Sequence, residues 1–318
     1  RPFHFKRMND LFISFLGVFL SFSSLASQVN LASSKNLNIR FDHTFPLAKD
    51  KAPVRVESLS RGVVTSAQGV LVMDADSNRV LYSKNPDRVL SAASLTKLLS
   101  AVVLNDLTPD WDAKLTITEQ DRQNGNRPNF YPGDVFTLKQ LLNIGLISSD
   151  NDAIAALVRS TGLSHDEFVK KMNEKAKVLG MNDSSFFEPT GLNPASRSTA
   201  RDILILLRAS LKDPKIQEVT SQKSYYVQNH RGVHNIYNTD VLLNTFLNQA
   251  PYKIIGGKTG FIDESGYSLA IQIKNKDTNI VVVVLGSKTS DDRFKEIKGL
   301  VSWIFQNFQW PQVGLTGL

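Results

Sequence analysis

The spacing of apolar residues predicts β-strands toward both ends of the chain and helices between them. Two β-rich runs at residues 68–74 and 79–83 flank a short polar turn, which is the pattern of a hairpin. Near the other end, apolar and polar residues alternate over 267–274, as expected for a strand with one buried face. Residues 280–285 are apolar without interruption and predict a strand that is covered on both faces.

Between these runs, apolar residues recur at helical spacing and polar residues mark the helix ends. Ser164 and Glu167 form the pattern of a capping box, and the helix that they open should end at Gly180. The other predicted helices cover residues 94–105, 138–147 and 151–159, a stretch that opens at 199–202, and a closing amphipathic stretch at 292–308. Strands from both ends of the chain can join one antiparallel sheet. We therefore expect an α/β fold of the α+β kind, with helices flanking the sheet and a helical lobe inserted between its strands.

Length and composition suit one large domain without disulfides. The chain has 318 residues, 42% of them hydrophobic, and no cysteine. Residues 27–60 are polar and lack sustained periodicity, so we expect a flexible lead-in there. The folded domain should then span 61–308, followed by a short tail at 309–318.

The first 26 residues have the pattern of a signal peptide. Arg1, Lys6 and Arg7 precede an apolar run at 11–22, and Ser24-Leu25-Ala26 offers small residues for cleavage after Ala26. The run falls short of the ~20 residues of a membrane span. We expect secretion across the cytoplasmic membrane, to the periplasm or cell wall. The alternative is an uncleaved membrane anchor.

The charge balance argues against a nucleic-acid partner. Removing residues 1–26 takes away three basic residues and one acidic residue, which lowers the formal net charge from +7 to +5. This mild excess is spread along the chain, without a basic block or interleaved aromatic residues. A solvated surface, with at most a loose association with an anionic membrane or wall, is the expected consequence.

Three short strings occur once each and in order along the chain. They are Ser94-Leu95-Thr96-Lys97, Ser149-Asp150-Asn151 and Lys258-Thr259-Gly260, and their first residues are 55 and 109 positions apart. Each string alone has an ordinary structural explanation as a helix cap, a helix junction or a turn. Three unique strings on the expected elements predict one catalytic site.

The first string pairs a nucleophile with a base. Ser94 and Lys97 are three residues apart and share a helix face. A serine hydroxyl needs a base to remove its proton, and a neutral lysine amine can do this where burial and a nearby cation lower its pKa. Lys258 is a candidate for that cation.

The other strings can complete the reaction. Ser149 can relay a proton to the leaving group, and Asn151 can orient Lys97 or hold a substrate amide. On a strand predicted over 252–261, Lys258 and Thr259 offer a cation and a hydroxyl to a substrate carboxylate, and Gly260 would let a substrate backbone approach. The backbone N–H groups of Ser94 and Phe261 are candidates for an oxyanion hole.

With these motifs, the sequence resembles the low-molecular-weight penicillin-binding proteins, the D-alanyl-D-alanine carboxypeptidase/endopeptidase family of serine peptidases. The stretches that carry the resemblance are residues 93–98, 148–153, 179–181, 188–192, 198–202 and 257–261, within about 60–308. The resemblance implies a β-lactamase/transpeptidase-like fold, an acyl-enzyme on Ser94, peptidoglycan stem peptides as substrate, β-lactams as inhibitors, and no metal or other cofactor. The short C-terminal tail resembles the endopeptidase branch more than the carboxypeptidases.

Three alternatives remain open on the residues alone. A class A β-lactamase would need a water-activating carboxylate, for which Glu188 is a candidate, although the following Pro-Thr-Gly favours a structural loop. A metallopeptidase would need clustered ligands, and His230 and His234 lack an H-E-x-x-H context. The third is a catalytically silent wall-binding protein, which the three intact strings disfavour.

Overall fold

The computed structural model describes residues 52–56, 60, 62–123 and 129–311. The expected signal peptide at 1–26 and most of the lead-in lie outside these residues. The strands are β1 (Val54–Arg55), β2 (Gly69–Asp74), β3 (Val80–Lys84), β4 (Leu90–Ser91), β5 (Lys114–Thr116), β6 (Val135–Thr137), β7 (Arg197–Ser198), β8 (Ser224–Asn229), β9 (Gly232–Tyr237), β10 (Tyr252–Ile262), β11 (Gly266–Asn275), β12 (Thr278–Ser287) and β13 (Phe308–Gln309).

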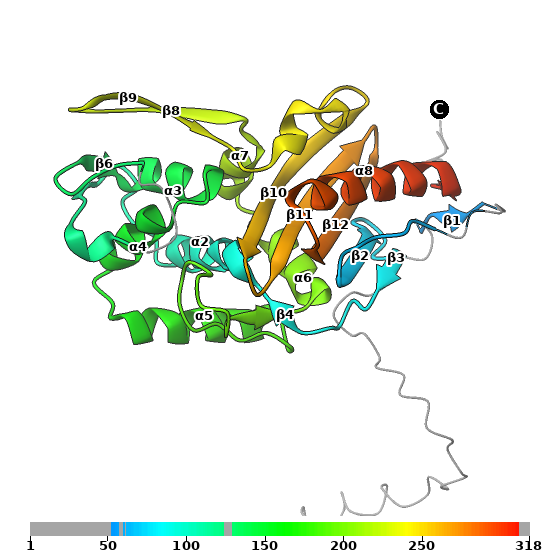
Figure 1. Ribbon diagram of the computed structural model, residues 1–318, viewed down its shortest axis with the longest axis horizontal. Helices are drawn as coiled ribbons and strands as arrows, with labels where there is room; N and C mark the ends of the chain where they lie inside the picture. Colours follow the sequence, from blue (N-terminus) through cyan, green and yellow to red (C-terminus); the bar gives the residue numbers. More distant parts are fainter. Residues whose placement is uncertain (1–51, 57–59, 61, 124–128, 312–318) are drawn as a thin grey trace, which may run out of the picture. The chain divides into compact units, whose positions relative to one another are not determined.

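The helices lie mostly between β4 and β10 (Figure 1). The α-helices are α2 (Thr96–Asp106), α3 (Leu138–Ile147), α4 (Asn151–Ser160), α5 (His165–Leu179), α6 (Ala200–Ser210), α7 (Pro214–Ser221) and α8 (Ser290–Asn307). Short 3₁₀ helices are η2 (Ala93–Leu95), η3 (Glu119–Asp121), η4 (Val241–Asn244) and η5 (Phe246–Asn248). None of these described helices has both the length and the apolar character of a membrane span.

The central feature is a five-stranded antiparallel sheet in the order β10-β11-β12-β2-β3. Strands from the two ends of the chain therefore pair in its middle, as the apolar pattern predicts. The expected hairpin at 68–83 is β2 and β3, and the uninterrupted apolar run is β12. Strand β10 lies at one edge of this sheet.

Each face of the sheet is covered by a helix, which explains the apolar character of β12. Val282 and Val284 pack with α8, whereas Val281 and Val283 join the core that contains α6 and the helical lobe. Successive side chains of a strand point to opposite faces, so both sets need a partner layer. In Figure 1, α8 lies across one side of β11 and β12 and α6 lies on the other.

The helical lobe is built from α2, α3, α4 and α5, which share one core. The capping box expected at Ser164 is present: its hydroxyl accepts from the Glu167 N–H, and α5 ends at Gly180 in the left-handed conformation. Helix α7 and the paired β8–β9 hairpin were not predicted. These segments are short and contain few apolar residues, so periodicity alone is a weak signal there.

Two boundaries of the sequence analysis are wrong. Strand β1, in the expected lead-in, pairs with β13, which reaches into the expected tail. The Trp310 indole N–H donates to Asp74 Oδ1 over 2.7 Å, so the start of the tail also contacts the sheet. Such short pairings depend on partners more than 200 residues away and leave little local pattern.

Substitutions in α5 test how much the lobe depends on its core. Phe168 is fully buried, whereas Val178 on the same helix is 79% exposed. Phe168→Ala should lower the free energy of unfolding by about 3–5 kcal/mol, because it removes a buried ring and leaves a cavity. Val178→Ala should change it by no more than ~0.5 kcal/mol. Urea unfolding of both variants measures this difference, and equal losses would contradict it.

Candidate active site

Ser94 and Lys97 lie together where η2 leads into α2. Ser94 is in the 3₁₀ turn and Lys97 is in the first turn of the α-helix, so the predicted helix begins slightly later than expected. Ala93, before Ser94, has a φ of 45°, an unusual value for a residue with a side chain. The Lys97 Nζ donates to Ser94 Oγ over 2.9 Å.

The amine of Lys97 is buried and surrounded by oxygen atoms. Its Nζ also donates to Asn151 Oδ1 and to the Thr190 backbone carbonyl, each over 2.6 Å. Burial lowers the pKa of Lys97 to about 8, and the negative charges of Glu188 and Asp150 oppose this shift. Roughly one Lys97 in ten is therefore neutral at pH 7.

The second string forms the corner between α3 and α4. Ser149 has a φ of 62°, which turns the chain sharply. Asp150 caps α4, because its Oδ1 accepts from the Ala153 N–H over 2.8 Å. Asn151 is the first residue of α4, and its side chain reaches Lys97. The hydrogen bond to Lys97 favours the orienting role of Asn151 over a substrate contact.

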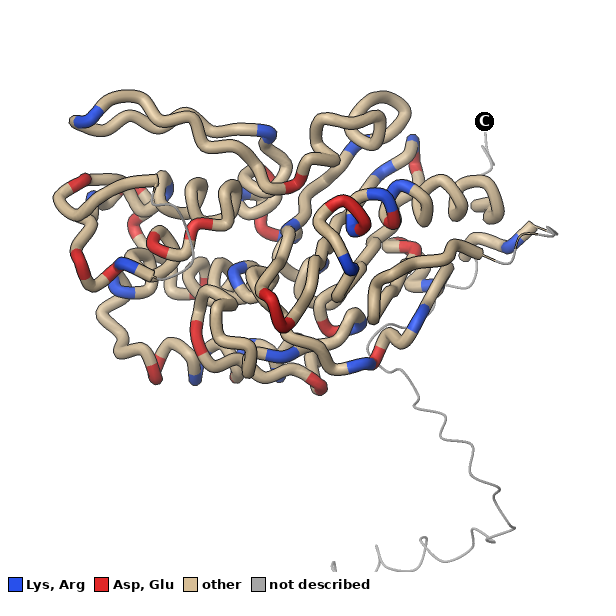
Figure 2. Tube along the Cα trace, viewed as in Figure 1, with Lys and Arg blue, Asp and Glu red and all other residues tan. Residues whose placement is uncertain are grey.

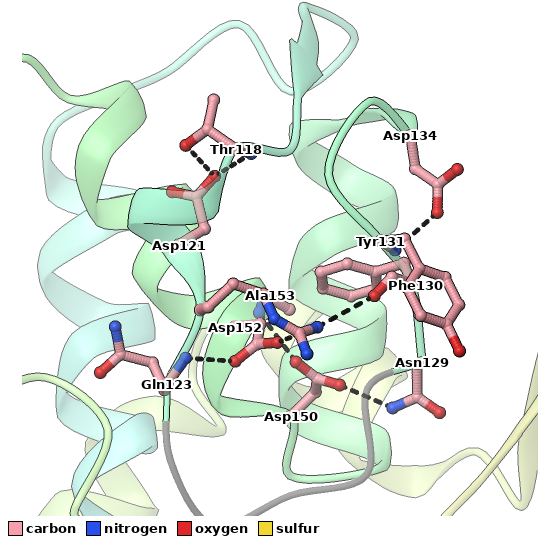
Figure 3. Close-up of polar contacts among 11 residues, drawn as sticks. Thr118, Asp121, Gln123, Asn129, Phe130, Tyr131, Asp134, Asp150, Asp152 and Ala153 are labelled. Atoms are coloured by element: carbon pink, nitrogen blue, oxygen red, sulfur yellow. Dashed lines mark hydrogen bonds and ion pairs between the residues drawn. The ribbon is translucent and has the colours of Figure 1, made fainter.

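Two carboxylates at the start of α4 bind residues that precede α3 in the chain (Figure 3). Asp150 Oδ2 accepts from the Asn129 side-chain amide over 2.6 Å. Asp152 Oδ1 accepts from the Gln123 backbone N–H over 2.7 Å, and its other oxygen lies 3.2 Å from the Arg122 guanidinium. Burial raises the pKa of Asp150, although its hydrogen bonds from Ala153 and Asn129 counteract this.

The Thr190 carbonyl is a site group that the motif search missed. It is held by a loop in which Glu188 accepts hydrogen bonds from Thr190 N–H, Thr190 Oγ1, Gly191 N–H and Asn193 N–H. Both oxygens of Glu188 are thus engaged within the loop, which favours the structural interpretation of Glu188 over that of a water-activating base. The Glu-Pro-Thr-Gly sequence marks the turn but not its contact with Lys97.

Gly191 allows this loop to lie directly against the nucleophile. Its φ is 87°, and a Cβ atom there would come within 1.8 Å of the Ala93 carbonyl oxygen. No side chain fits in that space. The backbone around Ser94 is therefore fixed by the loop as well as by α2.

The third string lies on β10 and is joined to the second through Thr239. The Thr239 N–H donates to the Ile147 carbonyl over 3.1 Å, and its hydroxyl lies 2.6 Å from Thr259 Oγ1. A Cβ on Gly260 would meet Leu95 Cγ at 3.3 Å and Ala92 O at 3.4 Å. The lack of a side chain at Gly260 thus lets β10 lie close to the turn that carries Ser94. The expected approach of a substrate backbone at Gly260 stays a prediction.

Lys258 is 2% exposed and lies among other charges. Burial, and then the positive charges of Lys97 and Arg293, lower the pKa of Lys258 well below its usual value, and Asp240 opposes this shift. The sequence analysis expected the charge of Lys258 to lower the pKa of Lys97. In the structure, the charge of Lys97 instead lowers the pKa of Lys258. Arg293 was also missed by the sequence analysis; its Nη1 donates to the Gly260 carbonyl over 3.2 Å.

Phe261 lies at the exposed end of the string. Its side chain is 42% exposed and stacks on Tyr267 with ring centroids 4.2 Å apart. Strand β10 pairs only with β11 in the described sheet, so its other edge is turned toward η2. The three strings thus meet at this edge.

The two histidines considered as metal ligands contact different partners. His234 Nε2 is 3.2 Å from Asn229 Oδ1, and His230 Nδ1 is 3.5 Å from Asp134. Among the described residues, no group of three or more His, Asp or Glu side chains is placed to hold a metal ion. Basic and acidic residues are interspersed along the described chain (Figure 2).

Comparison with known proteins agrees with this arrangement. The sequence profile described as D-alanyl-D-alanine carboxypeptidase matches residues 56–289. A D-alanyl-D-alanine endopeptidase of Pseudomonas aeruginosa is 33% identical over 238 residues, covering 74% of this chain and 76% of that protein.

Two solved structures are similar in fold. An evolved putative penicillin-binding protein homolog from Mycobacterium tuberculosis has a TM-score of 0.72 and 26% identity, over 83% of this chain and 100% of that one. Penicillin-binding protein D2 of Listeria monocytogenes, solved with cefotaxime bound, has a TM-score of 0.67 and 27% identity, over 77% and 100%. A profile match across most of the domain, together with a Ser-Lys pair at the edge of this sheet, means that the chain belongs to the D-alanyl-D-alanine carboxypeptidase family of serine peptidases.

Proposed function

We propose that this chain cleaves D-alanyl bonds of peptidoglycan stem peptides through an acyl-enzyme on Ser94. The observation that carries the proposal is the set of three oxygens around Lys97 Nζ. A protonated amine donates to all three. A neutral amine has only two N–H groups, and the Asn151 and Thr190 oxygens can only accept. Its lone pair is therefore left for the Ser94 hydroxyl, which can donate.

The proposed reaction follows from this arrangement. Ser94 Oγ bonds to the carbonyl carbon of the penultimate D-Ala while its proton moves to Lys97 Nζ. The oxyanion is held by the Ser94 and Phe261 N–H groups. The C–N bond then breaks, and the proton held by Lys97 Nζ passes by way of Ser149 to the leaving amine. Water later attacks the Ser94 ester, which releases the new carboxylate and restores the hydroxyl.

The remaining groups of the site fit the substrate's carboxylate. Lys258 supplies a buried amino group and Thr259 a hydroxyl, both on β10. Both kinds of substrate carry a carboxylate on the residue that leaves. In one, that residue is the terminal D-Ala; in the other, it is the D-configured centre of the cross-linked residue. The endopeptidase relative supports cleavage of cross-links as the main activity. The cefotaxime-bound relative supports β-lactams as ligands of the same site.

Acylation by a penicillin tests the nucleophile and the base. Because only neutral Lys97 can accept the proton, the maximal acylation rate should rise about tenfold per pH unit below pH 8 and level off above it. Ser94→Ala should not be labelled. Lys97→Arg should acylate at least ~100-fold more slowly, since a guanidinium stays protonated. Labelling with a fluorescent penicillin, stopped at a series of times, measures these rates. An acylation rate that stays the same from pH 6 to pH 9 would contradict the role of Lys97.

A digest of muropeptides tests the substrate. Purified cross-linked dimers should be converted to monomers by the wild-type protein and left intact by Ser94→Ala, with mass spectrometry as the readout. A pentapeptide monomer serves as the second substrate. Release of its terminal D-Ala, with dimers left intact, would identify a strict carboxypeptidase instead.

We also propose that residues 1–26 direct export and are removed. The support is the order of basic, apolar and small residues at 1–26. Protein recovered outside the cytoplasmic membrane should begin at Ser27. N-terminal sequencing reads this directly, and membrane-bound protein that retains these residues would favour an anchor.

A further inference from the structure

The β8–β9 hairpin has one side packed on the protein and one side turned to water. Residues opposite each other in paired antiparallel strands point to the same side. Val227 of β8 and Ile236 of β9 lie on the packed side, where they join the lobe core beside α3. The register places six side chains on the other side, which we call the outer face: Ser224, Tyr226, Gln228, Val233, Asn235 and Tyr237.

The outer face exposes three large side chains in a row. Tyr226 and Val233 are each 67% exposed, and Tyr237 is 68% exposed. Tyr226 is opposite Asn235, which lies midway between the other two on β9, so it is the diagonal neighbour of both. Large exposed side chains that gather on one surface indicate an interaction site, whereas those scattered singly do not.

The rings of the outer face are held on a fixed support. At the hairpin tip, Arg231 Nε donates to the buried Asp134 Oδ1 over 2.9 Å, and the guanidinium lies 5.3 Å from the centroid of the Tyr131 ring. On the outer face, the Asn235 side-chain amide donates to the Tyr237 hydroxyl over 2.6 Å. A surface that is ordered before it binds loses less conformational entropy on binding.

The outer face is uncharged, which narrows the class of ligand. None of its six side chains, all within the described chain, is basic or acidic, and Figure 2 shows the hairpin blue only toward its tip and its base. A nucleic acid or an anionic membrane needs basic residues on the surface that it contacts. Six side chains are also far fewer than the about 20–30 residues per side of a stable protein interface. Phenol rings and amides instead suit a neutral ligand that is rich in hydroxyl groups.

This face begins beside the catalytic edge. Tyr237 ends β9, and two residues later Thr239 bonds to the Ile147 carbonyl and lies 2.6 Å from Thr259 Oγ1. A stem peptide of peptidoglycan is joined covalently to a glycan strand, so the proposed substrate extends beyond the catalytic groups. Its stem peptides carry carboxylates, whereas its sugar rings are neutral and rich in hydroxyl groups.

We propose that the outer face of the β8–β9 hairpin is a docking surface for the glycan strand of the substrate, a neutral chain of N-acetylated amino sugars. The inference rests on the proposed function of the site. The rings of Tyr226 and Tyr237 pack against the C–H faces of sugar rings, and the amides of Gln228 and Asn235 exchange hydrogen bonds with acetamido and hydroxyl groups. The hairpin takes no part in acylation. It adds a second point of attachment for substrate that is still joined to its glycan.

Binding of the N-acetylglucosamine hexamer, a neutral amino-sugar chain without peptide, tests the surface directly. Isothermal titration calorimetry measures its dissociation constant. Tyr226→Ala should weaken binding about 5-fold, and adding Tyr237→Ala should weaken it further, because each change removes a stacking ring. Tyr226→Phe keeps the ring and should lose less than Tyr226→Ala. Val178→Ala, which removes an exposed apolar side chain on α5, should bind as the wild type does.

Hydrolysis separates the docking surface from the catalytic groups. The substrates are cross-linked dimers that keep their sugar chains and the same cross-linked peptides without sugars. For the sugar-linked dimers, Tyr226→Ala should raise KM about 5-fold and leave kcat unchanged. For the peptides alone, both constants should match the wild type. The rate at which a fluorescent penicillin acylates Ser94 verifies that the variant is folded.

The outcomes distinguish this inference from the proposed function. If the wild-type protein is not acylated on Ser94 and cleaves neither dimer, the proposed function fails. If Ser94 is acylated but the hexamer does not bind, or binds equally to Tyr226→Ala and the wild type, the docking surface is overturned. An equal rise in KM for the sugar-free peptides would assign the face to the stem peptide, and this would overturn the inference as well.

Discussion

The burial of the Lys97 amine is the constraint on which the rest of the site depends. An amine removed from water needs oxygen partners, and here they come from three separate parts of the chain: η2, α4 and the 188–193 loop. The requirement fixes how the α3–α4 corner and the loop approach α2. It also explains why Gly191 and Gly260 lie where two backbones come close to the Ser94 turn.

Lys258 is buried as well, but the proposed reaction needs it in the opposite protonation state. In the proposed reaction, Lys97 has to lose its proton to work as a base, whereas Lys258 has to carry a proton to attract an anion. Desolvation pushes both toward the neutral form. Their surroundings differ. Carbonyl and amide oxygens around Lys97 leave its lone pair for Ser94, whereas Lys258 lies near the positive charges of Lys97 and Arg293, and the charge of Asp240 only opposes the lowering of its pKa.

Much of this could be predicted from the sequence, because the informative signals are local. The three strings identify Ser94, Lys97, Ser149, Asn151 and the β10 residues, and the alternation over 267–274 and the apolar run at 280–285 identify β11 and β12. The Thr190 carbonyl, Asp240 and Arg293 were missed. A backbone oxygen has no sequence signature, and a lone Asp or Arg gains meaning only through partners brought near by folding. The β1–β13 pairing was missed for the same reason.

The order of strands in the central sheet also determines when the domain can fold. Val72 of β2 pairs with Val282 of β12, so the middle of the sheet joins residues made early and late in synthesis. A chain that stops before β12 has β2 and β3 but neither their neighbour nor the α8 layer. Its apolar strand face stays exposed to water, and closing so long a loop is slow. The sheet therefore cannot be completed before β12 and α8 have been made, and until then the unfinished chain should depend on whatever keeps its apolar strands from aggregating.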